Sequence, residues 1–339
     1  MSLYRKYRPQ SFKEVIGEDH IVSVLENEIK LGNLAHAYLF SGSRGTGKTS
    51  VARIFAQAIG TSKNDLYEID AASNNGVDEI RELGESVHTL PFDSKYKVYI
   101  LDEAHMLSKA AFNAFLKTLE EPPAHVIFIL ATTELEKLPE TIQSRCQTFV
   151  FKRPNQSVLK EFVLSIAKKE GKALDPEAAE LTALLGDGSF RDTHGILEKI
   201  VASTTAKKIT RDDVERVTGA PRAELVRNIL ESIIEQNLEK GMRAIHQARE
   251  ANADIKVFSR MILERLRFFF LLRLKAGMDD YILKETSEDD FTYLKALAEK
   301  AGPNLTSDII LKFIDAVENS GRTSIPELAL ELALSDSIK

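Results

Sequence analysis

One segment of the sequence constrains the fold more than any other: a glycine-rich stretch, GSRGTGKT from Gly42 to Thr49, that matches the phosphate-loop pattern G-x-x-x-x-G-K-[ST] in full. It follows a short apolar run, AYLFS at 37–41, and precedes VARIFAQAI at 51–59, where apolar residues recur with helical spacing. Strand, glycine loop and helix in this order distinguish a phosphate loop from an ordinary glycine-rich turn. The segment therefore predicts a binding site for the phosphates of a nucleotide.

The residues of this loop have separate expected roles. Glycines let the backbone pass close enough to phosphate oxygens for its NH groups to bind them, and the following helix contributes a positive N-terminal end. Lys48 is expected to contact the β- and γ-phosphates, and the Thr49 hydroxyl is expected to bind Mg²⁺. The residues predicted to line the phosphate site are Gly42, Ser43, Arg44, Gly45, Thr46, Gly47, Lys48, Thr49 and Ser50.

Three later apolar runs predict more strands of a parallel sheet. They are VYIL at 98–101, VIFILA at 126–131 and TFVF at 148–151. These runs lack the apolar–polar alternation of a strand with one face in water, and helical segments lie between them. The first part of the chain is therefore predicted to be an α/β fold, a parallel sheet with helices on both faces.

Polar residues follow two of these runs directly. Asp102 and Glu103 come after one, and Thr132 and Thr133 come after the next. Open α/β sheets bind ligands at the carboxyl ends of their strands. We expect Asp102 to hold the Mg²⁺ shell and Glu103 to orient or deprotonate a water that attacks the β–γ phosphate bond. The two threonines, or the backbone beside them, are expected to sense the γ-phosphate or to fix the attacking water; the alternative is that they cap a helix.

The sequence changes character after Arg153-Pro154. Strand-like runs give way to helical periodicity, and a Gly and Pro interruption at 218–221 divides the helical sequence in two. The predicted domains are an α/β nucleotide-binding domain at 1–153, a small helical domain at 154–218 and an all-helical domain at 219–339. The apolar stripe at 261–274 is interpreted as buried helix packing, because it is too short and too charged to span a membrane.

Composition limits the partners and the compartment. Lys and Arg number 45 against 51 Asp and Glu, a formal net charge of −6, so a nucleic-acid contact has to come from a local basic surface. The single cysteine, Cys146, cannot form an intramolecular disulfide and is expected to be a buried small residue rather than a reactive thiol. No stretch approaches about 18 uninterrupted apolar residues. We therefore expect a cytoplasmic protein with no membrane span.

Seven segments spread along the chain carry a family pattern. They are YRKYRPQSFKEVIGEDH (4–20), HAYLFSGSRGTGKTS (36–50), EIDAASNNGVDEIR (68–81), VYILDEAHMLSKAAFNAFLKTLEEPP (98–123), SRC (144–146), GSFRD (188–192) and IPELALELAL (325–334). Together they resemble the AAA+ clamp-loader ATPases of bacterial DNA replication, over essentially the whole chain. The resemblance implies that 154–218 is the helical lid of an AAA+ domain and that 219–339 is a collar through which subunits assemble.

Several residues gain a role only from this resemblance. Arg145, in SRC, matches a finger that acts in trans on the ATP of a neighbouring subunit, and Arg191, in GSFRD, matches a lid sensor that touches phosphate in cis. The residues implied to line or support the adenine pocket are Tyr7, Arg8, Val15, Ile16 and Gly17. Those implied to face DNA phosphates are Lys117, Arg81, Asn74 and Asn75, for which a solvated face is the alternative.

The resemblance implies an ATP-hydrolysing motor subunit that opens a ring-shaped sliding clamp and leaves it on DNA at a primer-template junction. The implied cofactors are ATP and Mg²⁺. The implied partners are the sliding clamp, primer-template DNA and other loader subunits, namely delta, delta-prime and further copies of this chain, at the nucleoid. Domains that tether the helicase and the polymerase core have no counterpart before Lys339, so neither tether is expected.

One segment departs from the family pattern. Family members usually insert a four-cysteine zinc module after the phosphate-loop helix, whereas here Gly60 to Leu66 (GTSKNDL) bridges that position without a cysteine. Zinc is therefore predicted to be absent.

Other functions stay open on the residues alone. Another AAA+ machine, such as a branch-migration helicase motor, should end in a DNA-binding winged helix, and no strand-rich pattern of that kind is seen. A non-hydrolysing structural subunit should have a degraded phosphate loop, whereas 42–49 is intact. A protein that binds ATP only to fold is a further alternative. A nucleoside kinase is disfavoured because Glu103 is suited to activating water.

Overall fold

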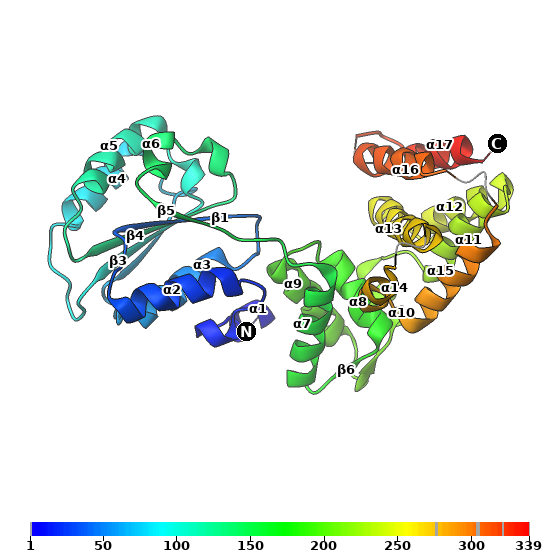
Figure 1. Cartoon of the computed structure of the whole chain (residues 1–339), viewed down its shortest axis with the longest axis horizontal. Helices are drawn as coiled ribbons and strands as arrows, with labels where there is room; N and C mark the ends of the chain where they lie inside the picture. Colours follow the sequence, from blue (N-terminus) through cyan, green and yellow to red (C-terminus); the bar gives the residue numbers. More distant parts are fainter. Residues whose placement is uncertain (1, 275–276, 303–305, 321, 339) are drawn as a thin grey trace. The chain divides into compact units, whose positions relative to one another are not determined.

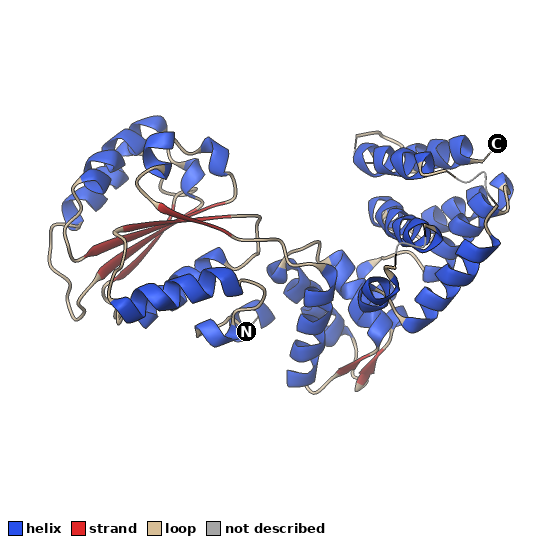
Figure 2. Cartoon of the chain, viewed as in Figure 1, coloured by secondary structure: helices blue, strands red, loops and turns tan. Residues whose placement is uncertain are grey.

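The computed structural model describes residues 2–274, 277–302, 306–320 and 322–338. The chain forms two compact units, one of Met1–Val158 with Gly188–His194 and the other of Leu159–Asp187 with Gly195–Lys339. The first unit contains a sheet between layers of helices (Figure 1), and the second is almost entirely helical (Figure 2). The domain boundaries predicted after residues 153 and 218 stay a prediction.

The first unit alternates strands and helices along the chain. Its strands are β1 (Ala37–Ser41), β2 (Leu66–Asp70), β3 (Lys97–Asp102), β4 (Val126–Thr132) and β5 (Gln147–Val150). Its helices are α1 (Leu3–Lys6), α2 (Asp19–Leu31), α3 (Lys48–Ala58), α4 (Val77–Ser86), α5 (Lys109–Glu120) and α6 (Glu140–Gln143), with 3-10 turns η1 (Phe12–Glu14), η2 (Ala104–Met106) and η3 (Leu135–Lys137). Helices α7 (Gln156–Lys169) and α9 (Phe190–Ser203) belong partly to each unit.

All five strands are parallel, in the order β2-β3-β4-β1-β5. In the register, Ser41 of β1 lies opposite Thr132 of β4, and Leu101 of β3 lies opposite Leu130 of β4. The carboxyl ends of these three strands therefore meet at one edge of the sheet. The prediction of a parallel α/β sheet is confirmed.

Each strand contributes side chains to two hydrophobic cores, one on each face of the sheet, because successive side chains point to opposite faces. Leu39, Leu101 and Leu130 pack against α4, α5 and α6, while Phe40, Ile100 and Ile129 pack against α2 and α3. All six side chains are buried. Each contributes about 1.5–3 kcal/mol to stability relative to an exposed position. Burial on both faces explains why β1, β3 and β4 are continuous apolar runs in the sequence.

The second unit is built from helices and one short parallel strand pair, β6 (Ala173–Leu174) with β7 (Lys208–Ile209). Its helices, besides most of α7 and α9, are α8 (Pro176–Leu185), α10 (Arg211–Thr218), α11 (Ala223–Ile234), α12 (Leu238–Glu250), α13 (Ile255–Arg273), α14 (Asp279–Glu285), α15 (Glu288–Lys300), α16 (Asp308–Asn319) and α17 (Leu328–Ser337). No helix among the described residues is long and apolar enough to cross a membrane.

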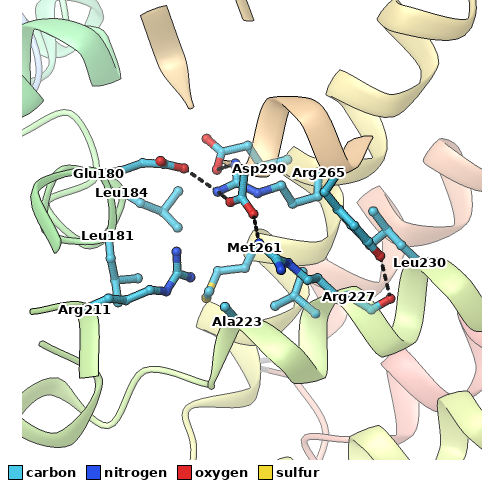
Figure 3. Close-up of a pocket in the computed structure, with 13 residues that line it drawn as sticks. Glu180, Leu181, Leu184, Arg211, Ala223, Arg227, Leu230, Met261, Arg265 and Asp290 are labelled. Carbon is cyan, nitrogen blue, oxygen red and sulfur yellow. Dashed lines mark hydrogen bonds and ion pairs between the residues drawn. The ribbon is translucent and has the colours of Figure 1, made fainter. Parts of the chain in front are cut away.

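Helix α13 is the buried centre of this unit. The apolar stripe at 261–274 lies almost wholly within it, and most of its large apolar side chains are buried, which confirms the interpretation as helix packing. Arg265 of the same helix pairs with Glu180 of α8 and, at 2.9 Å, with Asp290 of α15 (Figure 3). Glu180 and Asp290 are both buried, so this ion network joins α8 to the helices that follow it in the chain.

Candidate active site

The glycine loop between β1 and α3 needs its glycines for conformation and for space. Gly42, Gly45 and Gly47 have φ of +149°, +77° and +103°, values that side-chain-bearing residues rarely adopt. A Cβ on Gly42 would lie 2.5 Å from the carbonyl oxygen of Phe151, and one on Gly45 would overlap the Ser189 hydroxyl. Helix α3 begins directly after the loop, so its free amides and positive end face the space that the loop encloses.

Lys48 is buried within this loop. Its Nζ donates hydrogen bonds to the carbonyl oxygens of Gly42 (2.7 Å) and Ser43 (2.9 Å). Burial lowers the pKa of Lys48, whereas the nearby Glu103 and Asp102 carboxylates act in the opposite direction. The ammonium group is therefore held by weak neutral acceptors in a partly desolvated place, where phosphate oxygens would be stronger partners. The residues present fit a nucleotide phosphate chain.

A hydroxyl and a carboxylate meet beside the loop. The Thr49 Oγ1 donates to Asp102 Oδ2 at 2.9 Å, although the two residues come from α3 and β3. Hard oxygen donors of this kind suit Mg²⁺, which usually takes only one or two protein ligands and completes its shell with water and phosphate oxygens. No group of three or more His, Cys, Asp or Glu side chains within the described ranges is arranged to hold a metal by itself. The pair fits a Mg²⁺ ion that is shared with a nucleotide.

Glu103 sits in a strained backbone conformation, with φ of +50° in a residue that bears a side chain. Its Oε2 accepts a hydrogen bond from the Thr133 hydroxyl at 3.2 Å. Thr132 makes different contacts: its Oγ1 accepts from the Glu134 amide (3.0 Å) and lies 3.1 Å from Nδ1 of His105. Of the two predicted threonines, Thr133 is therefore the one that contacts the predicted catalytic carboxylate.

His105 and Glu134 were not predicted as site residues. The side chain of His105 is largely buried beside Thr132 at the end of β4, with Nε2 3.3 Å from Glu134 Oε1. The available sequence pattern was the spacing D-E-A-H, which puts a histidine three residues after Asp102. Glu134 carries no comparable pattern, because its position beside His105 depends on β3 and β4 being neighbours.

The segment with Arg191 lies against the glycine loop. The Phe190 amide donates to the Gly45 carbonyl at 3.0 Å, and Ser189 is buried against the same glycine. The positive charge of Arg191 contributes to the lowered pKa of Lys48, after the larger effect of burial. The fold thus brings Arg191, which is 143 positions after Lys48 in the sequence, to the predicted phosphate site.

Arg145 lies near the amino-terminal ends of β1 and β5, whereas the glycine loop follows the carboxyl end of β1. It comes just before β5, whose Gln147 pairs with Tyr38 near the start of β1. Its guanidinium donates to Glu120 Oε1 (2.6 Å) and to the Thr141 carbonyl (2.8 Å). The register therefore separates Arg145 from the glycine loop of its own chain by the length of β1.

The residues implied for the adenine pocket lie before α2. Val15, Ile16 and Gly17 form the loop after η1, and Ile16 is exposed. Arg8 donates to the Ser50 hydroxyl at 3.0 Å and ties the N-terminal segment to α3, while Tyr7 is half-buried at the end of α1. The neighbouring Glu18, not predicted from the sequence, is buried and accepts from the Lys152 amide at 2.9 Å. Burial raises the pKa of Glu18 to about 7.

The residues implied for DNA belong to neighbouring elements. Lys117 on α5 and Arg81 on α4 are exposed, and Arg81 pairs with Asp78 at 3.1 Å. The Asn74 amide donates to the Asp70 carbonyl (3.0 Å), and the carbonyl of Asn75 accepts from the Ser108 amide (3.1 Å). Helices α4 and α5 pack on the same face of the sheet, so these residues share one side of the unit.

The cysteine-free bridge at 60–66 is held by a carboxylate. Asp65 is fully buried and accepts from the amides of Phe92 (2.5 Å), Asp93 (2.9 Å) and Ser94 (2.9 Å). Burial alone would raise its pKa, but these hydrogen bonds outweigh burial and lower the pKa to about 2.

Cys146 is distant in sequence from this bridge. It packs against the sheet core, and burial raises the pKa of its thiol to about 12. Cys146 is only partly buried, so the expectation of a buried small residue is met in part.

These features define a class of protein before any particular relative is considered: a P-loop α/β fold with a site for a nucleotide. A solved structure shares this fold. The Thermotoga maritima RuvB Holliday junction branch migration motor superimposes with a TM-score of 0.54, at 24% identity, over 68% of this chain and 80% of that chain. Similarity at this level of identity concerns the fold.

Sequence relatives identify the family within that class. The family profile described as "DNA polymerase III, delta subunit" matches residues 17–75 and 61–155, and that of "DNA polymerase III subunits gamma and tau domain III" matches residues 209–335. DNA polymerase III subunit gamma of Buchnera aphidicola subsp. Schizaphis graminum is 33% identical over 91% of both chains. The chain belongs to the DNA polymerase III gamma/tau family, which confirms the resemblance found in the sequence.

Other relatives are longer than this chain. DNA polymerase III subunit tau of Bacillus subtilis is 35% identical over 98% of this chain, which spans 62% of that relative. The gamma/tau subunit of Mycoplasma pneumoniae is 40% identical over 72% of this chain and 39% of its own length.

Proposed function

We propose that this chain is an ATP-hydrolysing motor subunit of the bacterial DNA polymerase III clamp loader, which opens a sliding clamp and loads it at primer-template junctions during DNA replication. The observation that carries the proposal is the meeting of Lys48, the Thr49–Asp102 pair and Glu103 at one edge of the sheet. A subunit that served only as a structural support would not need this arrangement. Its occurrence in a gamma/tau family member supports a motor role.

The chemistry follows from the side chains. The glycine loop and Lys48 bind the phosphates of ATP, while Thr49 and Asp102 hold Mg²⁺. When bound, Mg²⁺ neutralises charge that develops on the β- and γ-phosphate oxygens. Glu103 accepts a proton from the attacking water or orients it, and the Thr133 hydroxyl holds the Glu103 carboxylate in place.

Two arginines complete the site in this proposal. Arg191 touches phosphate in cis, supported by the contact of its segment with Gly45. Arg145 acts in trans, since its position near the amino-terminal end of β1 suits a neighbour's site rather than its own. To act there, Arg145 has to exchange its exposed partner Glu120 for a phosphate, a change that costs little because surface ion pairs are weak.

The proposed partners are the sliding clamp, primer-template DNA and other loader subunits, including delta, delta-prime and further copies of this chain. DNA phosphates would meet Lys117, Arg81, Asn74 and Asn75 without base readout. Zinc is proposed to be absent, because Asp65 ties the short bridge to the loop at 92–94 through hydrogen bonds. Metal analysis of the purified chain tests this point. A cytoplasmic location at the nucleoid follows from the proposed DNA substrate.

The test is steady-state ATP hydrolysis by the loader assembly with sliding clamp, with and without primer-template DNA. Wild-type turnover should rise with the junction. Glu103→Gln should keep ATP binding and lose turnover by about 100-fold or more, and Arg145→Ala should lose junction-stimulated turnover. Arg243→Ala, an exposed arginine on α12, is the matched control and should behave as wild type. Turnover that ignores clamp and junction, or that survives Glu103→Gln, would refute the motor role.

A further inference from the structure

His105 occupies a buried position between the two loops that form the hydrolytic edge of the sheet. Its side chain is 7% exposed, and it belongs to η2, the turn that follows Glu103. Nδ1 lies 3.1 Å from Thr132 Oγ1, and Nε2 lies 3.3 Å from Glu134 Oε1. The Glu134 amide in turn donates to Thr132 Oγ1 at 3.0 Å. His105, in the turn after β3, Thr132, at the end of β4, and Glu134, just after β4, thus form a closed ring of contacts: two hydrogen bonds and the 3.3 Å approach of His105 Nε2 to the Glu134 carboxylate.

The Glu134 carboxylate assigns one proton in the ring. A carboxylate can only accept, so His105 Nε2 carries the hydrogen that faces Glu134. His105 Nδ1 shares a hydrogen bond with the Thr132 hydroxyl, whose oxygen also accepts from the Glu134 amide. Glu134 is further held by Lys137 at 2.6 Å.

The ring holds the backbone on either side of Thr133. Thr132 and Glu134 flank Thr133, so the backbone on both sides of Thr133 is held by His105. The Thr133 hydroxyl then lies 3.2 Å from Glu103 Oε2, as a hydrogen bond requires. His105 Nδ1 is 3.6 Å from the same oxygen, too far for a hydrogen bond. His105 therefore reaches the catalytic carboxylate through Thr133.

We propose that His105 is a positioning residue for ATP hydrolysis, which orders the loop at 132–134 so that Thr133 orients the Glu103 carboxylate toward the attacking water. This inference rests on the proposed ATPase function. Its physical basis is preorganisation: a carboxylate that is free to rotate spends less time in the geometry that proton transfer requires.

The first experiment removes the polar contacts of His105 while keeping an aromatic side chain at that position. His105→Phe retains the aromatic volume but removes both nitrogens, and His105→Gln retains an amide that can donate to Glu134. In the loader assembly, His105→Phe should lower kcat about tenfold with KM for ATP changed less than twofold, and His105→Gln should recover part of the loss. A loss that appears in KM alone, or no loss, would overturn the proposal.

The second experiment asks whether His105 acts through Thr133. Thr133→Val removes the hydroxyl directly, and the double variant Thr133→Val with His105→Phe should be no slower than Thr133→Val alone. Two losses that multiply would show independent effects and would refute the inference. If His105→Phe does not fold, Glu134→Ala breaks the ring from its half-exposed side and takes its place in the same cycle.

Glu103→Gln separates this inference from the proposed function. If Glu103→Gln keeps wild-type turnover, the motor role itself fails. If Glu103→Gln abolishes turnover while His105→Phe leaves kcat unchanged, only the role of His105 fails.

Discussion

The substitution Asp65→Asn tests how the short bridge at 60–66 is held without zinc. The wild-type carboxylate is fully buried and receives three backbone amides from the loop at 92–94. An asparagine side chain has one oxygen that can accept, and its NH₂ group would face the amides of Asp93 and Ser94, which are donors themselves. Because the variant leaves buried donors unpaired, we expect it to lower the free energy of unfolding by about 3 kcal/mol.

The Asp65 carboxylate should also make the free energy of unfolding depend on pH. The pKa of Asp65 is about 2 in the folded chain, below its ordinary value of 3.8. A depressed pKa contributes stability at pH values above the ordinary pKa and loses it as the pH falls toward the folded value. This contribution is about 2 kcal/mol at pH 7, and about half of it should be lost by about pH 3. The stability gap between wild type and Asp65→Asn should therefore narrow below about pH 4.

Urea unfolding of the whole chain, followed by circular dichroism at several pH values, measures both effects. Asp78→Asn is the matched control, because Asp78 is exposed on the neighbouring helix α4 and should change stability by less than about 0.5 kcal/mol. An Asp65→Asn variant as stable as the control at pH 7, or a gap that stays constant from pH 7 to pH 3, would refute the reasoning.

Three further predictions concern other parts of the chain. Arg265→Met leaves the buried Glu180 without its ion-pair partner, whereas Asp290 keeps Arg227, and it should destabilise the chain by about 3–5 kcal/mol in urea unfolding; an unchanged midpoint would count against the ion network. Gly45→Ala should weaken ATP binding, measured by calorimetry, at least tenfold, whereas Gly32→Ala, with a similar φ of +67° in open space, should bind ATP as wild type. Cys146, whose pKa burial raises to about 12, should resist iodoacetamide at pH 8 in the folded chain and react in urea; labelling of the folded chain would contradict its burial.

The sequence by itself determined the parts of the protein whose chemistry is local. The glycine loop is encoded within eight consecutive residues, because positive φ at Gly42, Gly45 and Gly47 depends on the absence of a Cβ at those positions. The strands β1, β3 and β4 were predictable because burial on both faces leaves a continuous apolar run. Strand β2 (Leu66–Asp70) was not predictable, because it lies at the edge of the sheet, where the exposed Tyr67, Glu68 and Asp70 interrupt the apolar run.

The tertiary structure decided every contact that joins distant segments. His105 meets Thr132 and Glu134 only because β3 and β4 are neighbours, and Asp65 meets its three amides only because the loops beside β2 and β3 are adjacent. Arg145 is separated from its own glycine loop by the register of β5 against β1. Local backbone conformation follows from neighbouring residue types, whereas these contacts follow from strand order and register, which the packing of the two cores selects across the whole sheet.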